Sequence, residues 1–269
     1  MIKNLCTFIF LFFFSSCFFG PLNDGSTGSE ESLEEETNES TSDIYTGEYS
    51  ATEVIGFEKS IQNRFDSSIT EALEKLPDSN LAFIEYKALI AVESSFNQYA
   101  ESPTRAKGLL QFTSIAIEDI NLHPGKLGFY FDNPYDPEQS IFAGVRAFEL
   151  LVQRLDNLYY NKKGGRPLPK EYKKILITGY NAGIGTLVDA LFILDHPSTS
   201  LAFDELILPL FGESIEDTPI YMAIIENASG NGVLVNGEID YDLVEFRYDE
   251  ISTYAYTILD LIPKEEEPL

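Results

Sequence analysis

From about residue 53 onward, apolar residues recur at intervals of three and four, the spacing that lines them up on one face of an α-helix. Three stripes of this kind stand out. They consist of Phe57, Ile61, Phe65, Ile69, Leu73 and Leu76; of Ile84, Ala88, Leu89, Val92 and Phe96; and of Ile141, Val145, Phe148, Val152 and Leu155. The pattern predicts a mainly α domain in which these stripes share one core.

Residues that favour helix ends give the expected boundaries. Asp78 or Ser79 is suited to cap the second helix. Asp136 is suited to cap the third helix, with Pro137 in its first turn and Gln139 reaching back to complete a capping box. The first three helices are therefore expected to begin near residue 53, after Ser79 and after Asp136.

Two further helices are expected after a Gly-Gly-Arg-Pro break in the chain. One runs from about residue 170 to 191 and is interrupted near 179–185. The other covers about 249–261. The stretch 196–248 between them is less regular and is expected to be an insertion, in which Gly232 to Gly237 forms a strand or hairpin.

The first 16 residues have the features of an export signal. Lys3 gives a positive start, and residues 5–14 form an apolar run that is too short to cross a bilayer. Ser15-Ser16-Cys17 follows, and small residues before a cysteine resemble a bacterial lipoprotein signal, here with Phe14 where Leu is usual. We expect cleavage after residue 16 and lipidation of Cys17. An ordinary secretory signal with an incidental cysteine is the alternative.

Residues 17–52 change in composition and are expected to form a disordered acidic tether. Their centre reads SEESLEEETNES, and residues 18–52 contain no Lys or Arg. Such a segment buries too little apolar surface to offset its ordering entropy, and its like charges extend it. We expect it to hold a folded domain, residues 53–269, away from a membrane.

Composition excludes several classes of protein. The chain of 269 residues carries a net charge of −26, whereas nucleic-acid binding needs a basic face, and so we expect no nucleic-acid partner. Two cysteines cannot supply a disulfide framework or a thiolate zinc site, and the two histidines, His123 and His196, leave little for a histidine metal cluster.

One acidic residue falls beside an apolar stripe. On the second helix, Glu93 has Leu89 four residues before it and Phe96 three residues after it, and both belong to the stripe. A carboxyl group at the edge of a buried face is partly desolvated, which raises its pKa and suits it to act as a general acid. The alternative is an ordinary solvated glutamate at the margin of an amphipathic helix.

Two other segments place amides and a phenol among apolar residues. Gly108-Leu109-Leu110-Gln111 has an amide after a glycine turn, and Gly179-Tyr180-Asn181-Ala182-Gly183 has a phenol and an amide within an apolar helix. Each has a purely structural alternative, because Gln111 could satisfy backbone groups and Tyr180-Asn181 could form a capped kink.

Taken in order, these segments resemble the soluble lytic transglycosylase (SLT) family, whose domain has a lysozyme-like fold. The family shows Glu-Ser at a helix end, then Gly-Leu-Met-Gln, then Ala-Tyr-Asn-Ala-Gly. Here Glu93-Ser94 fits the first motif, 108–111 fits the second with Leu for Met, and 179–183 fits the third with Gly for Ala. A last motif, Glu-Thr-x-x-Tyr, is kept only as Glu250 and Tyr254. The resemblance covers 80–195 well and the last helix loosely.

The resemblance implies a peptidoglycan lytic transglycosylase with one acidic residue, Glu93, that serves first as acid and then as base. It implies supporting roles for Tyr180, which would orient Glu93, and for Tyr254. Substrate-binding roles fall to Ser94, Gln111, Asn181, Gly108 and Gly183, the two glycines letting the backbone approach the glycan. The implied partners are peptidoglycan glycan strands, and none of these implied roles requires a metal or a cofactor. The lipid expected on Cys17 adds a membrane of the cell envelope as a partner.

Two other functions stay open at this point. A hydrolytic muramidase on the same fold would need a second carboxylate besides Glu93. The acids considered for that role are Glu85, Glu101, Asp132, Asp136 and Glu250. A surface lipoprotein that binds glycan or an envelope partner without catalysis is the alternative of another class. The sequence does not distinguish cleavage at chain ends from cleavage within chains, and it does not identify the membrane.

Overall fold

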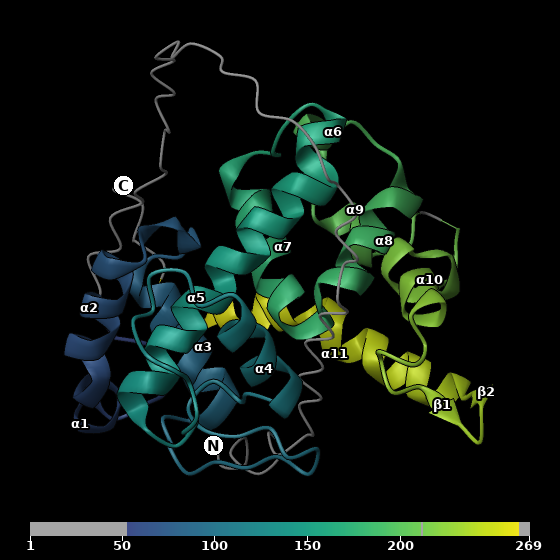
Figure 1. Ribbon diagram of the computed structural model, residues 1–269. Coiled ribbons are helices and arrows are strands. Elements are labelled where there is room, and N and C mark those ends of the chain that lie inside the picture. The colour runs from purple at the N-terminus through teal and green to yellow at the C-terminus, as the bar shows by residue number, and fades with distance from the viewer. Residues whose placement is uncertain (1–52, 211, 264–269) are drawn as a thin grey trace, which may run out of the picture.

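The computed structural model describes residues 53–210 and 212–263, and these residues form a mainly helical domain, as expected (Figure 1). The lipoprotein signal, Cys17 and the acidic tether lie outside the described residues. A single two-stranded antiparallel ladder is the only sheet in the part of the chain that is described. The elements are α1 (Lys59–Gln62), α2 (Asp66–Lys75), α3 (Phe83–Ser94), α4 (Ser114–Leu122), α5 (Pro137–Leu155), α6 (Asn161–Lys163), α7 (Pro169–Ala182), α8 (Ile184–Leu194), α9 (Asp204–Ile207), α10 (Pro219–Glu226), β1 (Leu234–Val235), β2 (Glu238–Ile239) and α11 (Tyr241–Asp260).

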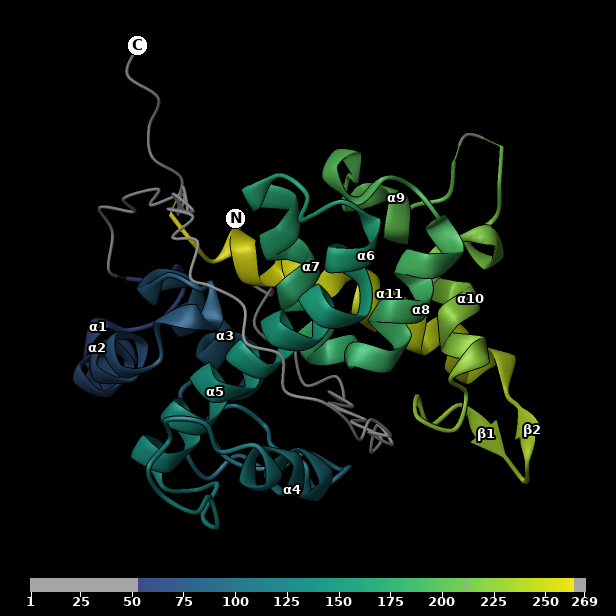
Figure 2. The same cartoon turned by 45° about the horizontal axis from the view of Figure 1, so that its top comes forward.

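Two helices, α3 and α11, decide where the site lies. Helix α3 is buried along nearly its whole length, and ten of its twelve residues are buried. The twenty-residue α11 packs against both α3 and α7, and it runs behind the other helices from the hairpin β1–β2 toward α3 (Figures 1 and 2). The two helices meet although about 150 residues separate them in the chain, because only their packing buries the apolar faces of both.

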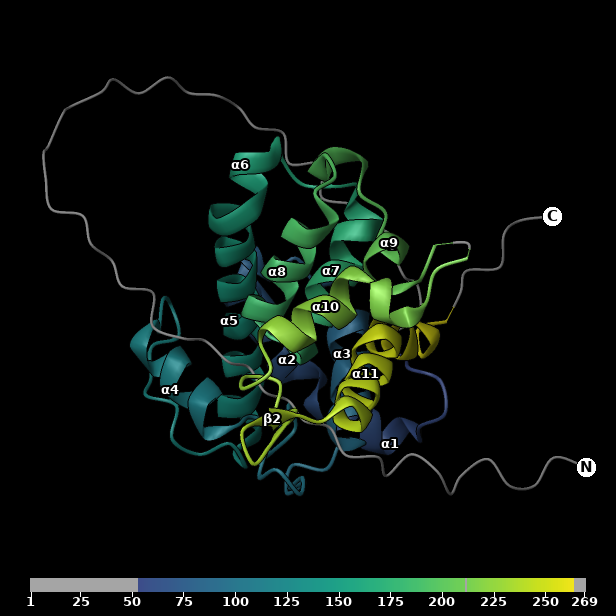
Figure 3. The ribbon, with the colours of Figure 1, turned by 90° about the vertical axis from the view of Figure 1, so that its right-hand side faces the viewer.

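The predicted start of α5 is confirmed in one part and wrong in another. The Asp136 carboxylate accepts a hydrogen bond from the backbone N–H of Gln139 at 2.9 Å, as expected of an N-cap. The Gln139 side chain does not complete a capping box. It accepts hydrogen bonds from the backbone N–H groups of Asp132 and Asn133, 3.2 Å away, because the preceding loop folds over the first turn. Figure 3 shows α5 continuing into α6 as one column.

The predicted cap of the second helix is wrong. Residues Pro77–Ser79 form a short 3-10 turn, and Asn80 adopts a left-handed backbone with a φ of 60° that ends it. Helix α3 begins only at Phe83. Its first turn is capped from inside the helix, since the carboxylate of Glu85 accepts a hydrogen bond from the backbone N–H of Ala82 at 2.8 Å.

The stretch 196–248 is more regular than expected. It contains α9, α10, the hairpin β1–β2 and the first eight residues of α11, which begins at Tyr241 and not near 249. Thr218 caps α10 with Pro219 in its first turn, and Asp240 caps α11. Helix α10 packs on α8 and α11, so this stretch extends the core. Helix α4, capped by Thr113, was not expected either.

Candidate active site

The carboxyl group of Glu93 is buried one residue before the end of α3. Only 6% of the residue is exposed, whereas its apolar neighbour Val92 is half-buried. This reverses the usual distribution on a helix, in which the acid faces water and the valine faces the core. The alternative of a solvated glutamate at the helix margin is therefore excluded by the structure.

The surroundings of Glu93 favour its protonated form. Burial raises the pKa of the Glu93 carboxyl to about 8, and the nearby negative charge of Glu250 acts in the same direction. A hydrogen bond from Tyr254 opposes them and lowers the pKa. The hydroxyl of Tyr254 donates this bond to Oε1, while Oε2 is buried without a hydrogen-bond partner among the described residues. Glu93 therefore holds a proton at neutral pH.

The chain reverses direction directly after Glu93. Ser95 and Phe96 both have left-handed backbones, with φ values of 51° and 61°, and Arg64 donates a hydrogen bond to the Phe96 carbonyl. The hydroxyl of Ser94 donates to the carbonyl of Ile90 within the helix at 3.1 Å. This turn ends α3 at the acidic residue and leads the chain into the loop that carries Gln111.

The loop around Gly108 and Gln111 is held by its own backbone. The Gln111 side chain is buried and donates hydrogen bonds to the carbonyls of Gly108, at 2.9 Å, and Ala100, at 3.3 Å. The NH₂ group of Gln111 therefore satisfies backbone carbonyls, which is the structural alternative given for this residue in the sequence analysis. Gly108 has a φ of +80°, and a Cβ there would stand 1.8 Å from the carbonyl oxygen of Pro134. The glycine is required by contact with the protein's own backbone.

The motif at residues 179–183, at the end of α7, packs on that loop through Tyr180. The hydroxyl of Tyr180 donates to the carbonyl of Leu110 at 2.8 Å, and its ring is stacked on Phe148 with centroids 4.9 Å apart. The phenol that donates to Glu93 is Tyr254, and the orienting role expected of Tyr180 stays a prediction. Gly179 stands where the family has Ala, and a Cβ there would come within 2.6 Å of a Leu187 methyl group.

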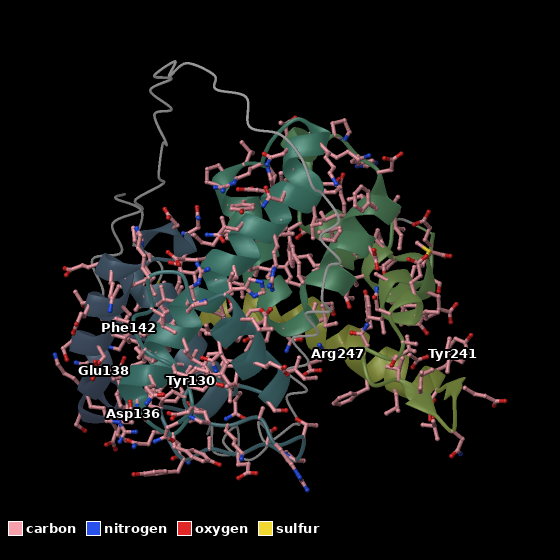
Figure 4. All side chains as sticks on the ribbon, viewed as in Figure 1. Tyr130, Asp136, Glu138, Phe142, Tyr241 and Arg247 are labelled. Atoms are coloured by element: carbon pink, nitrogen blue, oxygen red, sulfur yellow. The ribbon has the colours of Figure 1, made fainter. Side chains whose placement is uncertain are left out.

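Asn181 joins α7 to α11 through an arginine that sequence reasoning missed. Arg247 is 2% exposed and donates to both oxygens of Asn181, at 3.0 Å to Oδ1 and 2.6 Å to the backbone carbonyl. It also pairs with Glu250 at 2.5 Å. Figure 4 shows Arg247 farther into the molecule than Tyr241 at the start of α11. The spacing of Arg247 and Glu250 suits an i,i+3 pair, but this signal requires a helix that begins before residue 249.

The remaining acids considered as a second carboxylate have other partners or positions. Glu85 pairs with Lys173 at 2.6 Å and caps α3. Glu101 accepts a hydrogen bond from the Tyr135 hydroxyl at 3.0 Å in an exposed loop. Asp132 is exposed, and Asp136 caps α5, well to the left of Arg247 in Figure 4. Of these five acids, all of which lie in the described part of the chain, Glu250 is the one whose charge acts on Glu93.

Gly183 separates α7 from α8 with a φ of +81°, which confirms the expected interruption. Within residues 53–210 and 212–263, no helix is long and apolar enough to cross a membrane. The same residues contain no group of three or more His, Cys, Asp or Glu side chains placed to hold a metal ion.

The described part of the chain is thus a mainly helical domain of the lysozyme-like class, with one desolvated glutamate at the end of a helix. Residues 75–193 match the family described as Transglycosylase SLT domain, and this match, together with the relatives below, supports an SLT-family domain in this part of the chain. The match includes Glu93, Gln111 and Asn181 but ends before α11.

Curated relatives share this part of the chain. Proteins named membrane-bound lytic murein transglycosylase F are 27% identical over 130 residues in Hahella chejuensis and 26% identical over 152 residues in Saccharophagus degradans. These alignments cover 47% and 56% of this chain, and 21% and 27% of the two relatives. A Vibrio cholerae protein of the same name is 30% identical over 105 residues, which are 38% of this chain and 16% of that protein. The chain thus spans about a quarter or less of the relatives it matches.

Proposed function

We propose that this chain is a membrane-anchored lytic transglycosylase that cleaves the β-1,4 bond between N-acetylmuramic acid and N-acetylglucosamine in peptidoglycan. The observation that carries the proposal is the state of Glu93. Its carboxyl group is buried, and its pKa of about 8 keeps it protonated at neutral pH, as a general acid requires. The family match and the names of the relatives support the substrate class.

In the proposed reaction, Glu93 gives its proton to the glycosidic oxygen, and the bond from that oxygen to C1 of the muramoyl sugar breaks. The resulting carboxylate then takes the proton from the C6 hydroxyl of the same sugar. The C6 oxygen bonds to C1 and closes a 1,6-anhydro ring, so that no water is consumed. Because the nucleophile belongs to the substrate itself, the second step gains the advantage of proximity.

One pairing favours this single-acid reaction over hydrolysis. A hydrolytic muramidase would need a second carboxylate free to activate a water molecule. Glu250 is the acid whose charge acts on Glu93, and its carboxylate is bound to the Arg247 guanidinium at 2.5 Å. This ion pair already engages the Glu250 carboxylate, so the carboxylate is not free to activate a water molecule. The geometry thus supports intramolecular closure of the sugar ring.

Purified sacculi test the proposal. Glu93→Gln keeps the shape of the side chain but has no proton to give, so we expect release of soluble muropeptides to fall by about 10²-fold or more. Glu101→Gln makes the same chemical change in an exposed loop and is expected to keep wild-type activity. Mass spectrometry of the wild-type products should show 1,6-anhydro ends.

Two outcomes would contradict the proposal. Products with reducing ends and an added water would identify a hydrolytic muramidase. Binding to sacculi without release of fragments, equal in wild type and in Glu93→Gln, would identify a glycan-binding lipoprotein.

We further propose that lipid on Cys17 holds the enzyme at a membrane of the cell envelope, on the periplasmic side, and that the acidic tether gives it reach. The relatives named membrane-bound support this location. Labelling with a radioactive fatty acid should mark the wild-type chain and not Cys17→Ser, which should leave the membrane fraction. Equal labelling of both chains would contradict the proposed anchor.

A further inference from the structure

Arg247 fixes the orientation of the Asn181 side chain. A guanidinium group has five N–H donors and no acceptor. Because Arg247 donates to both the backbone oxygen and Oδ1 of Asn181, the amide must turn its oxygen toward α11. The NH₂ group of Asn181 is therefore directed away from Arg247. Both side chains are almost fully buried, so water does not compete for these bonds.

The NH₂ group of Asn181 is a hydrogen-bond donor that lacks an acceptor. Its nitrogen is buried and has no hydrogen-bond partner among the described residues. A buried donor left unsatisfied is costly, so a bound acceptor that completes it gains free energy. The acetamido carbonyl and the hydroxyl groups of a glycan are acceptors of the right kind.

The same guanidinium holds a negative charge near Glu93. Arg247 and Glu250 are spaced i,i+3 on α11, and their side chains are 2% and 8% exposed. The groups of α11 that face Glu93 are Tyr254 and Glu250. On α2, which also packs on α3, Asp66 is engaged by Lys87 at 2.9 Å.

We infer that Arg247 is a positioning residue of the active site. It holds Asn181 so that the amide NH₂ group meets an acceptor oxygen of the glycan, and it holds Glu250 beside Glu93. This inference rests on the proposed function and extends it to a residue outside the matched family region.

The first test is Arg247→Met in the full chain, assayed by release of soluble muropeptides from purified sacculi. Loss of the two hydrogen bonds from Arg247 to Asn181 should raise the apparent KM about tenfold or more, which is the effect expected when hydrogen bonds to a charged group are lost. Activity falls at alkaline pH where Glu93 loses its proton. Without the positive charge of Arg247 beside it, the negative charge of Glu250 disfavours that loss more strongly, so the alkaline limb of the pH profile should move to higher pH.

Two further variants separate the two roles. Glu250→Gln removes the negative charge, so the alkaline limb should move to lower pH. The ratio of activity at about pH 8.5 to that at about pH 7 then falls about twofold for a pKa half a unit lower. Arg247→Lys keeps the positive charge but lacks the planar guanidinium group that can donate to two oxygens at once. It should raise the apparent KM with an alkaline limb close to that of wild type.

Helix α5 offers a matched control. Arg146 and Glu149 are also buried, spaced i,i+3 and paired, at 2.8 Å, and Arg146 donates to the backbone carbonyl of His123 at 2.9 Å. Arg146→Met and Glu149→Gln should lower thermal stability as much as the α11 variants do but leave the alkaline limb and KM unchanged.

Two results together would overturn the inference. The alkaline limbs of Arg247→Met and Glu250→Gln would coincide with that of wild type, and their apparent KM values would lie within about twofold of that of Arg146→Met. A twofold change in KM is smaller than the loss of one hydrogen bond produces. If Arg247→Met does not fold, Arg247→Lys and Glu250→Gln decide. The Glu93→Gln variant distinguishes failure of the proposed function from failure of the inference about Arg247. Loss of activity in Glu93→Gln, with Arg247 variants that behave like the control, would reject the inference alone.

Discussion

Two buried glutamates on α3 show how partners decide the chemistry of a carboxyl group. Glu85 is 1% exposed, pairs with Lys173 at 2.6 Å and accepts a hydrogen bond from the backbone of Ala82. Glu93 is nearly as buried, but its described partners are a phenol and a second acid. A cation offsets the desolvation of Glu85, whereas Glu93 relieves its own desolvation by keeping a proton.

This difference makes stability depend on pH through Glu93. Its pKa is about 8 in the folded chain and near 4.5 when exposed, so the folded state holds a proton that the unfolded state has lost between these values. Stability should therefore fall as pH rises from about 5 to 8. Glu93→Gln has no charge to bury and should be more stable than wild type, by about 2 kcal/mol or more at about pH 9. Urea unfolding followed by circular dichroism measures this, and an equal difference at about pH 5 and pH 9 would contradict it.

At the scale of elements, the loop between α3 and α4 depends on contacts between backbones. Gly108 has a left-handed backbone, and the Pro134 carbonyl occupies the position of a Cβ. Tyr180 and Gln111 bind the carbonyls around this turn. A change at Gly108 should therefore disturb the position of Gln111 as well as the stability of the fold.

Gly108→Ala should lower the free energy of unfolding by about 3 kcal/mol or more, because a Cβ would overlap a backbone oxygen that cannot move cheaply. Gly56 is the matched control. It has a φ of +89°, but no atom lies within 4 Å of a Cβ built there, so Gly56→Ala should cost only about 1 kcal/mol of backbone strain. Equal losses in urea unfolding would show that backbone strain alone matters.

At the scale of the whole molecule, charge opposes the proposed substrate. The chain has 44 acidic and 18 basic residues, and peptidoglycan carries carboxylates on its peptides. Repulsion between like-charged surfaces slows encounter, and salt screens it. Specificity must then come from short-range contacts such as those proposed for Asn181.

Raising the salt concentration from about 10 to 150 mM should lower the apparent KM for sacculi, because the Debye length falls from about 30 to 8 Å. The kcat should change little, since Glu93 is buried. An uncharged oligosaccharide of N-acetylglucosamine serves as control and should bind equally at both concentrations. A KM for sacculi that rises with salt would contradict this electrostatic picture.

The sequence by itself determined the mainly helical class, the buried face of α5, the cap at Asp136 and the motifs that contain Glu93, Gln111 and Asn181. These features depend on spacing within one helix or turn, and a local pattern carries them. The same locality limits the prediction of α3, where Glu85 and Lys87 are buried besides the expected stripe and the expected cap lies in a 3-10 turn that ends at Asn80. The start of α11 was missed although its signal is local, since Asp240 caps the helix.

Only the tertiary structure decided which groups meet Glu93. Tyr254 lies 161 residues away from it in the chain, and Arg247 reaches Asn181 across 66 residues. No periodicity connects such positions, because their contact follows from how α11 packs on α3 and α7. The raised pKa of Glu93 is likewise a property of that packing, since desolvation exists only once the helices exclude water.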